Sequence, residues 1–319
     1  MIAAGMAYAP DAASSASNVA GENQHGIVLI LVGMAAFAVG DAVMKAVGTA
    51  LPLGQVIAVR GVFSCLLLVP FLVRAGVPDL AALAHPRVLL RTLFEIGAAV
   101  CFLSALVLIP IASATAIIQA IPLAVTFFGA LFLGERVGWR RYAAILVGFA
   151  GVLIIVRPWS DGLEPGALLA LATVFLSTGR DLVTRGVPSA IPTLHIVAVT
   201  TLGVTLTGVV WMAVEGPAPM TMPDAAWLAL AAACVVIGIA GVAGAVRIGE
   251  LAVVAPFRYS IFLWALILGW LVFGELPDAT TLLGAAIVLA SGLYTLLREA
   301  KRGDDLAARS GKRGVPARR

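Results

Sequence analysis

The sequence predicts an all-α membrane protein in which ten transmembrane helices form two inverted repeats of five helices. Apolar residues make up 61% of the 319 residues, charged residues make up 12%, and the mean hydropathy is +1.05. A soluble domain is roughly half apolar and about a quarter charged. In addition, the second half of the chain repeats the first at a constant shift of 140 residues. The protein is therefore expected to lie in a lipid bilayer and to consist of two repeated halves.

The ten predicted helices are apolar stretches separated by short loops that contain helix-stopping prolines. A span needs about 20 mostly apolar residues to cross the hydrocarbon core. Helices are expected because a lone strand would leave its backbone unpaired in lipid. The predicted spans are residues 26–46, 54–73, 88–109, 113–133, 139–157, 166–186, 193–214, 225–247, 251–273 and 279–297.

The repeat is clearest between residues 26–47 and 166–187, where Asp41 aligns with Asp181 and Lys45 with Arg185. Each half holds five helices, which is an odd number, so the second half enters the membrane from the opposite side. We therefore expect one repeat over residues 26–158 and another over residues 166–297.

The two ends of the chain differ in charge. Residues 1–25 contain no Lys or Arg and are predicted to be a disordered tail, whereas residues 298–319 hold eight of the 21 basic residues. Basic residues near the other helix ends also favour the side of the N-terminus. Both termini are therefore expected in the cytoplasm. The basic tail is expected to anchor at the lipid surface, and no nucleic-acid partner is predicted from the net charge of +4.

Two charged pairs are predicted to gate the two mouths of the bundle. Asp41 and Lys45 are four residues apart and share a helix face near the outer surface. Asp181 and Arg185 occupy the matching place near the cytoplasm. The alternative is that Lys45 and Arg185 reach the interface, with each Asp as a local counter-ion.

Further charges fall deep inside predicted spans. Arg60 needs an acidic partner such as Asp41, a water-filled cavity or an anionic substrate group. Glu95 could pair with Arg91 on its own helix or with Arg258 at a comparable depth. Asp41 and Glu95 are also the candidate proton carriers.

Two spans are predicted to be interrupted helices, because residues 119–128 contain Pro122 and residues 256–260 begin with Pro256. Backbone groups freed by a break are tolerated in lipid where they line a cavity. The aromatic residues in this prediction could instead be packing residues. The predicted cavity residues are Thr115, Gln119, Arg258, Tyr259 and Ser260, with Phe94, Phe102 and Trp264 as candidate walls.

The two repeats end in LFLGERVGWRRYAAILVGFAGVLII from Leu131 and LVFGELPDATTLLGAAIVLASGLY from Leu271. With Pro122, Lys45 and Arg60, these segments resemble the EamA-domain family of the drug/metabolite transporter superfamily over residues 26–297. The resemblance implies a ten-helix carrier of the bacterial inner membrane, with a cavity lined by helices 1 to 4 and 6 to 9. The second repeat departs from the pattern, since Phe262 stands where Pro122 would recur. The glutamates of the two Gly-Glu pairs, Glu135 and Glu275, are interpreted as structural caps.

The predicted function is secondary transport of a small organic metabolite by alternating access. The sequence lacks the G-x-x-x-x-G-K-[ST] loop of ATP-driven pumps. The members of the EamA-domain family that this sequence resembles include carriers proposed for riboflavin, S-adenosylmethionine and amino acids. The sequence does not distinguish between these solutes. Direction of transport, coupling ion and oligomeric state stay open.

Other classes lack the residues they need. A membrane-embedded transferase would need a nucleophile beside a base, but His25, His85 and His195 are scattered. The three cysteines all lie in apolar segments and are expected to pack. No cofactor and no metal site are predicted, no stretch resembles a channel filter, and a scaffold would not need the buried charges.

Overall fold

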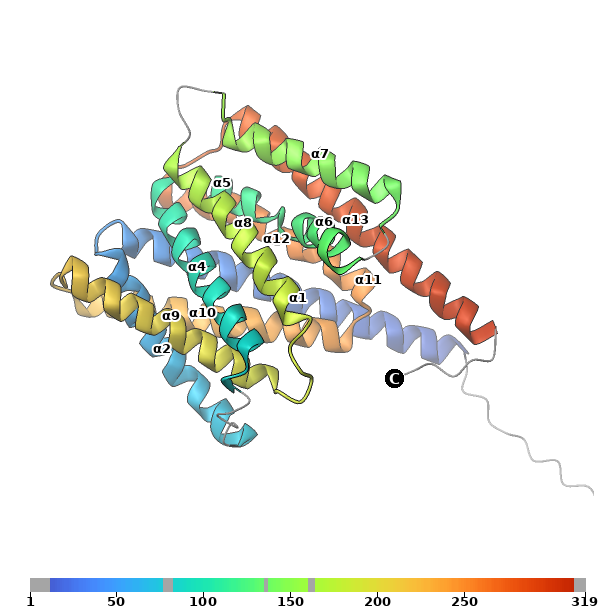
Figure 1. Cartoon of the computed structure of the whole chain (residues 1–319), viewed down its shortest axis with the longest axis horizontal. Coiled ribbons are helices and arrows are strands. Elements are labelled where there is room, and N and C mark those ends of the chain that lie inside the picture. Colours follow the sequence, from blue (N-terminus) through green and yellow to red (C-terminus); the bar gives the residue numbers. More distant parts are fainter. Residues whose placement is uncertain (1–11, 77–82, 135–136, 160–163, 313–319) are drawn as a thin grey trace, which may run out of the picture.

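The computed structural model describes residues 12–76, 83–134, 137–159 and 164–312, and within these ranges it is helical with no strand (Figure 1). Ten of the described helices are long and apolar enough to cross a membrane. The predicted all-α fold with ten spans is therefore confirmed, with ends that shift by a few residues.

The helices fall into two sets of five spans that follow the repeat. The first set is α1 (Ala12–Gly48), α2 (Leu53–Ala75), α4 (Pro86–Leu108), α5 (Ile111–Ile118) with α6 (Ile121–Leu133), and α7 (Trp139–Val156). The second set is α8 (Pro165–Thr184), α9 (Thr193–Glu215), α10 (Met222–Ile248), α11 (Leu251–Val254) with the 3₁₀ helix η1 (Ala255–Tyr259) and α12 (Ser260–Phe273), and α13 (Ala279–Lys312).

The N-terminal segment differs from the sequence prediction. Residues 12–25 were expected to lie in a disordered tail, whereas α1 already begins at Ala12. This stretch is rich in Ala and Ser and holds no proline, so the apolar span can propagate its helix backwards. The side chain of Asn23 also accepts the backbone N–H of Glu250 at 2.7 Å. Residues 1–11 lie outside the described residues.

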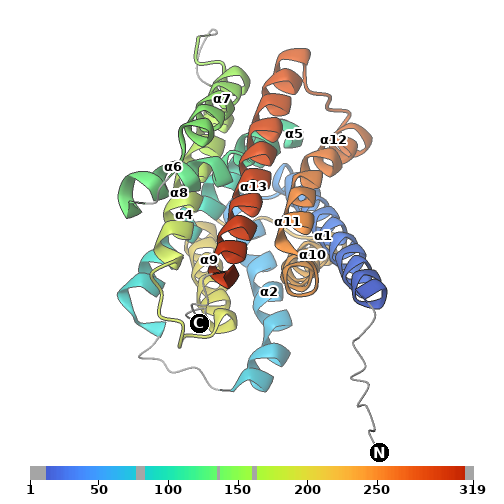
Figure 2. The same ribbon diagram turned by 90° about the vertical axis from the view of Figure 1, so that its right-hand side faces the viewer.

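The two repeats interlock through matching helix pairs (Figures 1 and 2). The first helix of each repeat packs along the third helix of the other, which gives the pairs α1 with α10 and α8 with α4. The second helices, α2 and α9, pack together, as do the fifth helices, α7 and α13. This exchange of partners is what an inverted repeat produces, and it leaves the centre lined by both halves.

Both predicted interruptions are present. The fourth span breaks at Gln119 and Ala120, between α5 and α6, and the ninth breaks where η1 passes into α12 at Ser260. A shift of 140 residues carries one break onto the other, although Phe262 replaces the second proline. Each span then ends at a left-handed glycine, Gly134 with φ 68° and Gly274 with φ 66°, a conformation that favours glycine.

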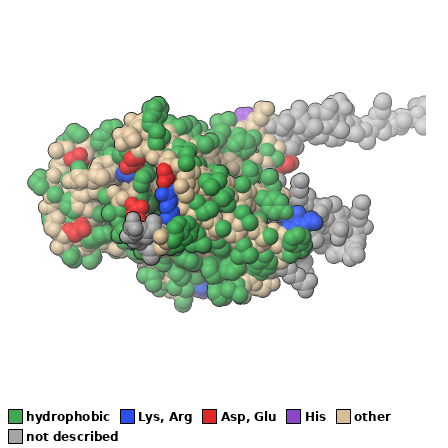
Figure 3. Space-filling view, turned by 90° about the horizontal axis from the view of Figure 1, so that it is seen from above, with side chains coloured by type: hydrophobic (Ala, Val, Ile, Leu, Met, Phe, Trp, Pro, Cys, Tyr) green, Lys and Arg blue, Asp and Glu red, His purple; other side chains and the backbone are tan. Residues whose placement is uncertain are grey.

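The core and the surface are both apolar. Ile111 and Ile117 of α5 are fully buried at the centre of the main cluster. Figure 3 shows a surface dominated by hydrophobic side chains, with charged side chains in small clusters. Exposed side chains such as Phe132, Val210 and Trp270 suit contact with lipid chains, because hydrocarbon offers no hydrogen bonds to polar groups.

Candidate functional site

A cavity of about 210 Å³ lies between the two repeats. Its walls come from α2 and α4 of the first repeat and from α8, α9 and α10 of the second. The lining residues are Arg60, Gly61, Ser64, Arg91, Glu95, Ala99, Arg180, Val197, Thr200, Thr201, Val204, Val235 and Ile239. A cavity at the boundary of inverted repeats is where secondary transporters hold their solutes.

An ion-pair chain crosses one wall of the cavity. Arg180 Nη1 lies 2.7 Å from Glu95 Oε2, and Arg180 Nε lies 2.8 Å from Asp181 Oδ1. The side chains of Arg180 and Glu95 are 24% and 27% exposed, so the pair is neither on the surface nor fully buried. It joins α4 to α8 and thus one repeat to the other.

The partner of Glu95 differs from both sequence hypotheses. Arg91, expected as one partner, donates to two hydroxyls instead, at 3.1 Å to Thr184 Oγ1 and 2.8 Å to Thr200 Oγ1. Arg258, the other expected partner, is exposed. Neither expected ion pair is found among the described residues, because α4 packs along α8 and brings Arg180 within reach of the carboxylate. Glu95 still acts on Arg91 electrostatically.

Arg180 is the main residue that the sequence interpretation missed. A signal was available, because a second arginine stands beside Asp181 inside an apolar span. Its counterpart in the first repeat is Gly40, so the repeat alignment drew attention to Asp181 and away from its neighbour.

Arg60 lines the cavity as a cation deep in the second span. Its Nε atom is buried and has no hydrogen-bond partner among the described residues. Asp41 and Glu95 are the acidic groups that act on it electrostatically. Asp41 itself is half-buried on α1 and is not among the cavity-lining residues.

The end of the bundle near Lys45 is held by a part-buried ion pair. Lys45 Nζ lies 2.7 Å from Glu275 Oε1 and donates to the carbonyl of Ile109 at 2.8 Å. Glu275 Oε2 also accepts the backbone N–H of Ile111 at 3.4 Å. Glu275 therefore has the capping role expected of it, although the helix that it caps is α5.

The predicted pairing of Lys45 with Asp41 is wrong. The carboxylate that Lys45 contacts is that of Glu275, 230 residues further along the chain. The contact forms because α1 packs against α12 and places Lys45 near the end of that helix. At the opposite end Asp181 bonds Arg180, and no bond between Asp181 and Arg185 is found among the described residues. Glu135, which the repeat places opposite Arg185, lies outside the described residues.

Further hydrogen bonds join helices at the Lys45 end of the bundle. The Gln55 side-chain amide exchanges two hydrogen bonds with the backbone of Ala218, at 3.0 and 2.9 Å. Glu215 accepts the N–H of Gly54 at 3.2 Å. The start of α2 is thereby fastened to the end of α9.

None of the eight predicted cavity residues lines this cavity. Thr115 is buried in α5 and Gln119 lies at the break that follows it. Tyr259 and Ser260 lie at the matching break, where Tyr259 Oη and Ser260 Oγ are buried and lack a hydrogen-bond partner among the described residues. These four polar residues therefore gather at the two interruptions and lie apart from the charged cavity.

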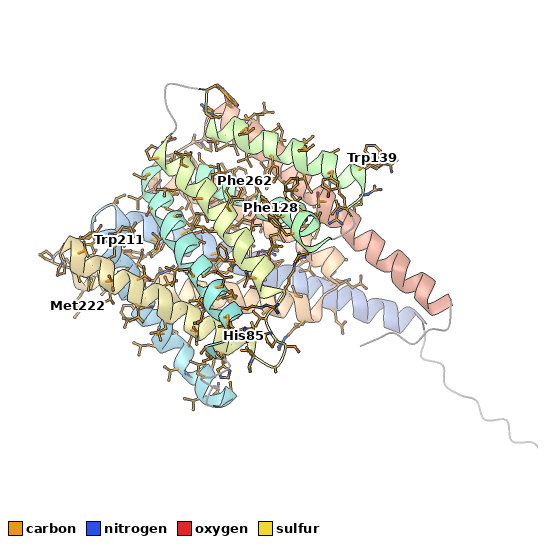
Figure 4. All side chains as sticks on the ribbon, viewed as in Figure 1. His85, Phe128, Trp139, Trp211, Met222 and Phe262 are labelled. Carbon is orange, nitrogen blue, oxygen red and sulfur yellow. The ribbon has the colours of Figure 1, made fainter. Side chains whose placement is uncertain are left out.

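The remaining predicted wall residues are packed elsewhere. Phe94 lies against Gly179 of α8, where an added Cβ would come within 2.7 Å of the ring. Phe102 packs on the main core, and Trp264 packs on the cluster around Ile30. Phe262, labelled in Figure 4, is buried in the main core.

The histidines serve local structure. His85, labelled in Figure 4, accepts the N–H of Arg87 at 3.2 Å at the start of α4. His195 Nε2 lies 3.2 Å from the carbonyl of Gly76. Within the described residues no group of three His, Cys, Asp or Glu side chains could hold a metal ion.

This geometry defines a multi-pass membrane protein with a polar cavity between two repeats. The sequence profile of the EamA-like transporter family matches residues 24–157 and again residues 164–297. The chain therefore belongs to the EamA-like transporter family, as the sequence resemblance predicted.

Individual relatives are transporters of differing solutes. A riboflavin transporter of Rhizobium johnstonii is 31% identical over 75% of this chain and 80% of its own length. The pseudopaline exporter CntI of Pseudomonas aeruginosa strain UCBPP-PA14 is 28% identical over 83% and 94%. An S-adenosylmethionine uptake transporter of Rickettsia conorii is 27% identical over 86% and 94%.

A solved crystal structure of another protein shares the fold. It aligns over 89% of this chain and 99% of its own, with a TM-score of 0.60 and 20% sequence identity.

Proposed function

We propose that this protein is a secondary transporter that carries a small organic metabolite by alternating access. The supporting observation is a cavity with charged residues between the repeats, together with one end of the bundle that the Lys45–Glu275 ion pair joins. A solute held there would reach one side of the membrane only after the helices at that side part.

The proposed location is a bacterial inner membrane, with both termini in the cytoplasm. The basic residues after Arg298 support this orientation. In this proposed orientation Lys45 and Glu275 would lie at the outer end, and their ion pair would hold that end closed.

The proposed moving units are the two repeats, residues 26–158 and 166–297. Lys45 with Glu275 would hold the outer mouth, and Asp181 and Arg185 with Arg180 would act at the inner mouth. The pairs of helices that cross between the repeats are the contacts along which such units would rock.

The proposed coupling groups are Asp41 and Glu95. Asp41 interacts with Arg60, and Glu95 pairs with Arg180 inside the cavity. A proton added to either carboxylate would weaken a contact between spans, which is how protonation could alter the balance of conformations.

The two helix breaks are proposed as a second polar part of the pathway. Its proposed polar residues are Thr115, Gln119, Arg258, Tyr259 and Ser260. The wall role of Phe94, Phe102 and Trp264 stays a proposal, since these side chains pack on other parts of the bundle. The unpartnered hydroxyls of Tyr259 and Ser260 support this, because such groups gain when a solute or water bonds them.

The test is solute flux into proteoliposomes that hold the purified protein. The panel contains labelled riboflavin, S-adenosylmethionine, amino acids and small organic acids, each with and without a proton gradient. Saturable flux of one compound is expected, and in Asp41→Asn the response to the gradient should be lost. Arg140→Gln, on the exposed start of α7, is the matched control.

No saturable flux of any compound through folded protein would contradict transport. Flux that responds to the gradient equally in Asp41→Asn would contradict coupling through Asp41 and leave transport standing.

A further inference from the structure

The charges in the cavity wall are unequal. Three guanidinium groups, Arg60, Arg91 and Arg180, face the space together with one carboxylate, Glu95. Placing charged groups away from water is costly unless each one is paired. The pairing of the three arginines therefore shows what the cavity still lacks.

Arg180 is the arginine that is already neutralised. It contacts the carboxylates of Glu95 and Asp181 at 2.7 and 2.8 Å. Two charge-assisted bonds of this kind leave it little to offer a ligand.

Arg91 is satisfied differently. Its described bonds use Nε and Nη1 and go to the hydroxyls of Thr184 and Thr200. Hydroxyls accept hydrogen bonds without supplying negative charge, and a guanidinium has five N–H donors. Arg91 therefore makes no direct ion-pair contact among the described residues and keeps spare donors at the cavity.

Arg60 provides the strongest sign of a missing partner. Its Nε atom is buried and has no hydrogen-bond partner among the described residues. A buried donor left without a partner costs about 1–3 kcal/mol. A ligand that accepts a hydrogen bond would recover that cost.

The rest of the wall is mostly apolar, with Ala99, Val197, Val204, Val235 and Ile239 among its residues. Ser64 and Thr201 also line it, but their hydroxyls donate to the backbone of their own helices. A volume of about 210 Å³ lies below the roughly 300–1,000 Å³ that is usual for drug-sized ligands. The cavity suits a small molecule with an apolar body and a charged end.

We propose that the cavity binds a small organic acid, with its carboxylate between Arg60 and Arg91 and its apolar body against the aliphatic wall. The inference names the solute class of the transport function proposed above and rests on that function. It favours small acids over bulky solutes among the candidates for this chain.

The neighbouring acids set a condition on this binding. Asp41 acts on Arg60, Glu95 acts on both Arg60 and Arg91, and Asp181 acts on Arg91. With all three acids ionised, they balance the three arginines. If Asp41 takes up a proton when a ligand carboxylate binds, the number of negative charges stays equal to the number of arginines. Binding should therefore strengthen as the pH falls.

The first test compares acids with their neutral counterparts in binding to the unaltered protein. Phenylacetate and isocaproate are titrated beside their amides into detergent-purified protein, with heat release and thermal unfolding as readouts. The acids should bind and raise the unfolding temperature, and the amides should do neither. Equal binding of acid and amide, or no binding by either acid, would overturn the proposal.

Two variants then locate the site. Arg60→Gln and Arg91→Gln should each weaken acid binding roughly ten- to a hundredfold, the value of one charge-assisted bond. Arg140→Gln should bind as the unaltered protein does. Unchanged binding in folded Arg60→Gln and Arg91→Gln would overturn the assignment, and if either misfolds, the acid–amide comparison decides.

The pH arm uses two values above the pKa of the acid itself. Binding should be tighter at the lower pH, and Asp41→Asn should remove the difference. A difference that persists in Asp41→Asn would overturn the condition placed on Asp41.

Failure of this proposal differs from failure of transport. Saturable flux of a neutral solute with no acid binding would sink the acid site and leave transport intact. Acid binding that depends on Arg60, without flux of any solute, would sink transport and leave the site.

Discussion

Two of the ion pairs that join the repeats differ in burial and in the number of their partners. Lys45 is 5% exposed, meets Glu275 at 2.7 Å and also holds the carbonyl of Ile109. Arg180 and Glu95 are 24% and 27% exposed and share their cavity with other charges. A buried ammonium whose hydrogen bonds are all made by adjacent groups is costly to separate from its partners. A half-buried guanidinium among several acceptors can change partners more easily. The difference indicates a fastened end at Lys45 and an adaptable centre.

Breaking the fastened end should have the largest effect. Lys45→Met leaves Glu275 without its cation, and we expect a loss of about 3 kcal/mol in unfolding free energy, at the low end for a buried pair because Glu275 keeps some access to water. Lys45→Met with Glu275→Leu should recover at least half of the loss. Thermal and denaturant unfolding in detergent measure both, with Arg140→Gln as control. A double variant no more stable than the single one would refute this account.

The fastened end also depends on close backbone approach. A Cβ at Gly54 would lie 2.5 Å from the N atom of Met212 and 2.8 Å from the C atom of Trp211. Gly54→Ala should therefore cost about 1–3 kcal/mol. Gly244→Ala is the matched control, since its nearest neighbour is a Leu29 methyl at 3.2 Å. Equal losses at the two glycines would argue against a tight α2–α9 contact.

The adaptable centre should show a weaker coupling. A double-mutant cycle with Glu95→Gln and Arg180→Gln should give about 1 kcal/mol, because partial exposure screens the pair and each group has other partners. The measurement is unfolding free energy of the two single variants and the double variant. A coupling as large as that between Lys45 and Glu275 would erase the contrast between the two regions.

The smallest effect concerns a pair at the exposed surface of the fastened end. Arg157 and Thr281 hold the pKa of Asp278 well below its ordinary value, chiefly through the Arg157 hydrogen bond. A carboxyl with a lowered folded pKa stabilises above its unfolded pKa of about 3.9, and that stability is lost as the pH falls further towards the folded value.

Asp278→Asn should thus cost less than about 1 kcal/mol at neutral pH, because Asp278 is 53% exposed. Asparagine keeps the cap on the N–H of Thr281, so the change isolates the ion pair. The unfolding free energy should fall less in the variant than in the unaltered protein as the pH is lowered from neutral to below about 4. An unchanged acid dependence would mean that Asp278 is not the group that titrates.

Helix positions and the repeat followed from the sequence because they depend on local hydrophobicity and on a constant shift. The two breaks followed as well, since a proline lies close to each, Pro122 and Pro256. Partners of charged residues did not follow. The i, i+4 rule joined Lys45 to Asp41, but tertiary packing brought Glu275 from 230 residues away.

The cavity illustrates the same limit. Arg60 and Glu95 were recognisable because charge inside an apolar span is costly. Which helices enclose the space depends on the exchange of partners between repeats, which places α9 and α10 in the wall. The threonines of α9 carried no signal on their own, because hydroxyls in membrane helices commonly bond their own backbone, as Thr201 and Thr205 do here.

The extension of α1 beyond the predicted first span has a practical consequence. Asn23 accepts the N–H of Glu250, immediately before α11, and so completes the start of the ninth span from a segment that would ordinarily be trimmed as a tail. A shortened chain beginning at residue 26 would leave that amide unbonded. For purification, an affinity tag at the C-terminus would leave this contact undisturbed.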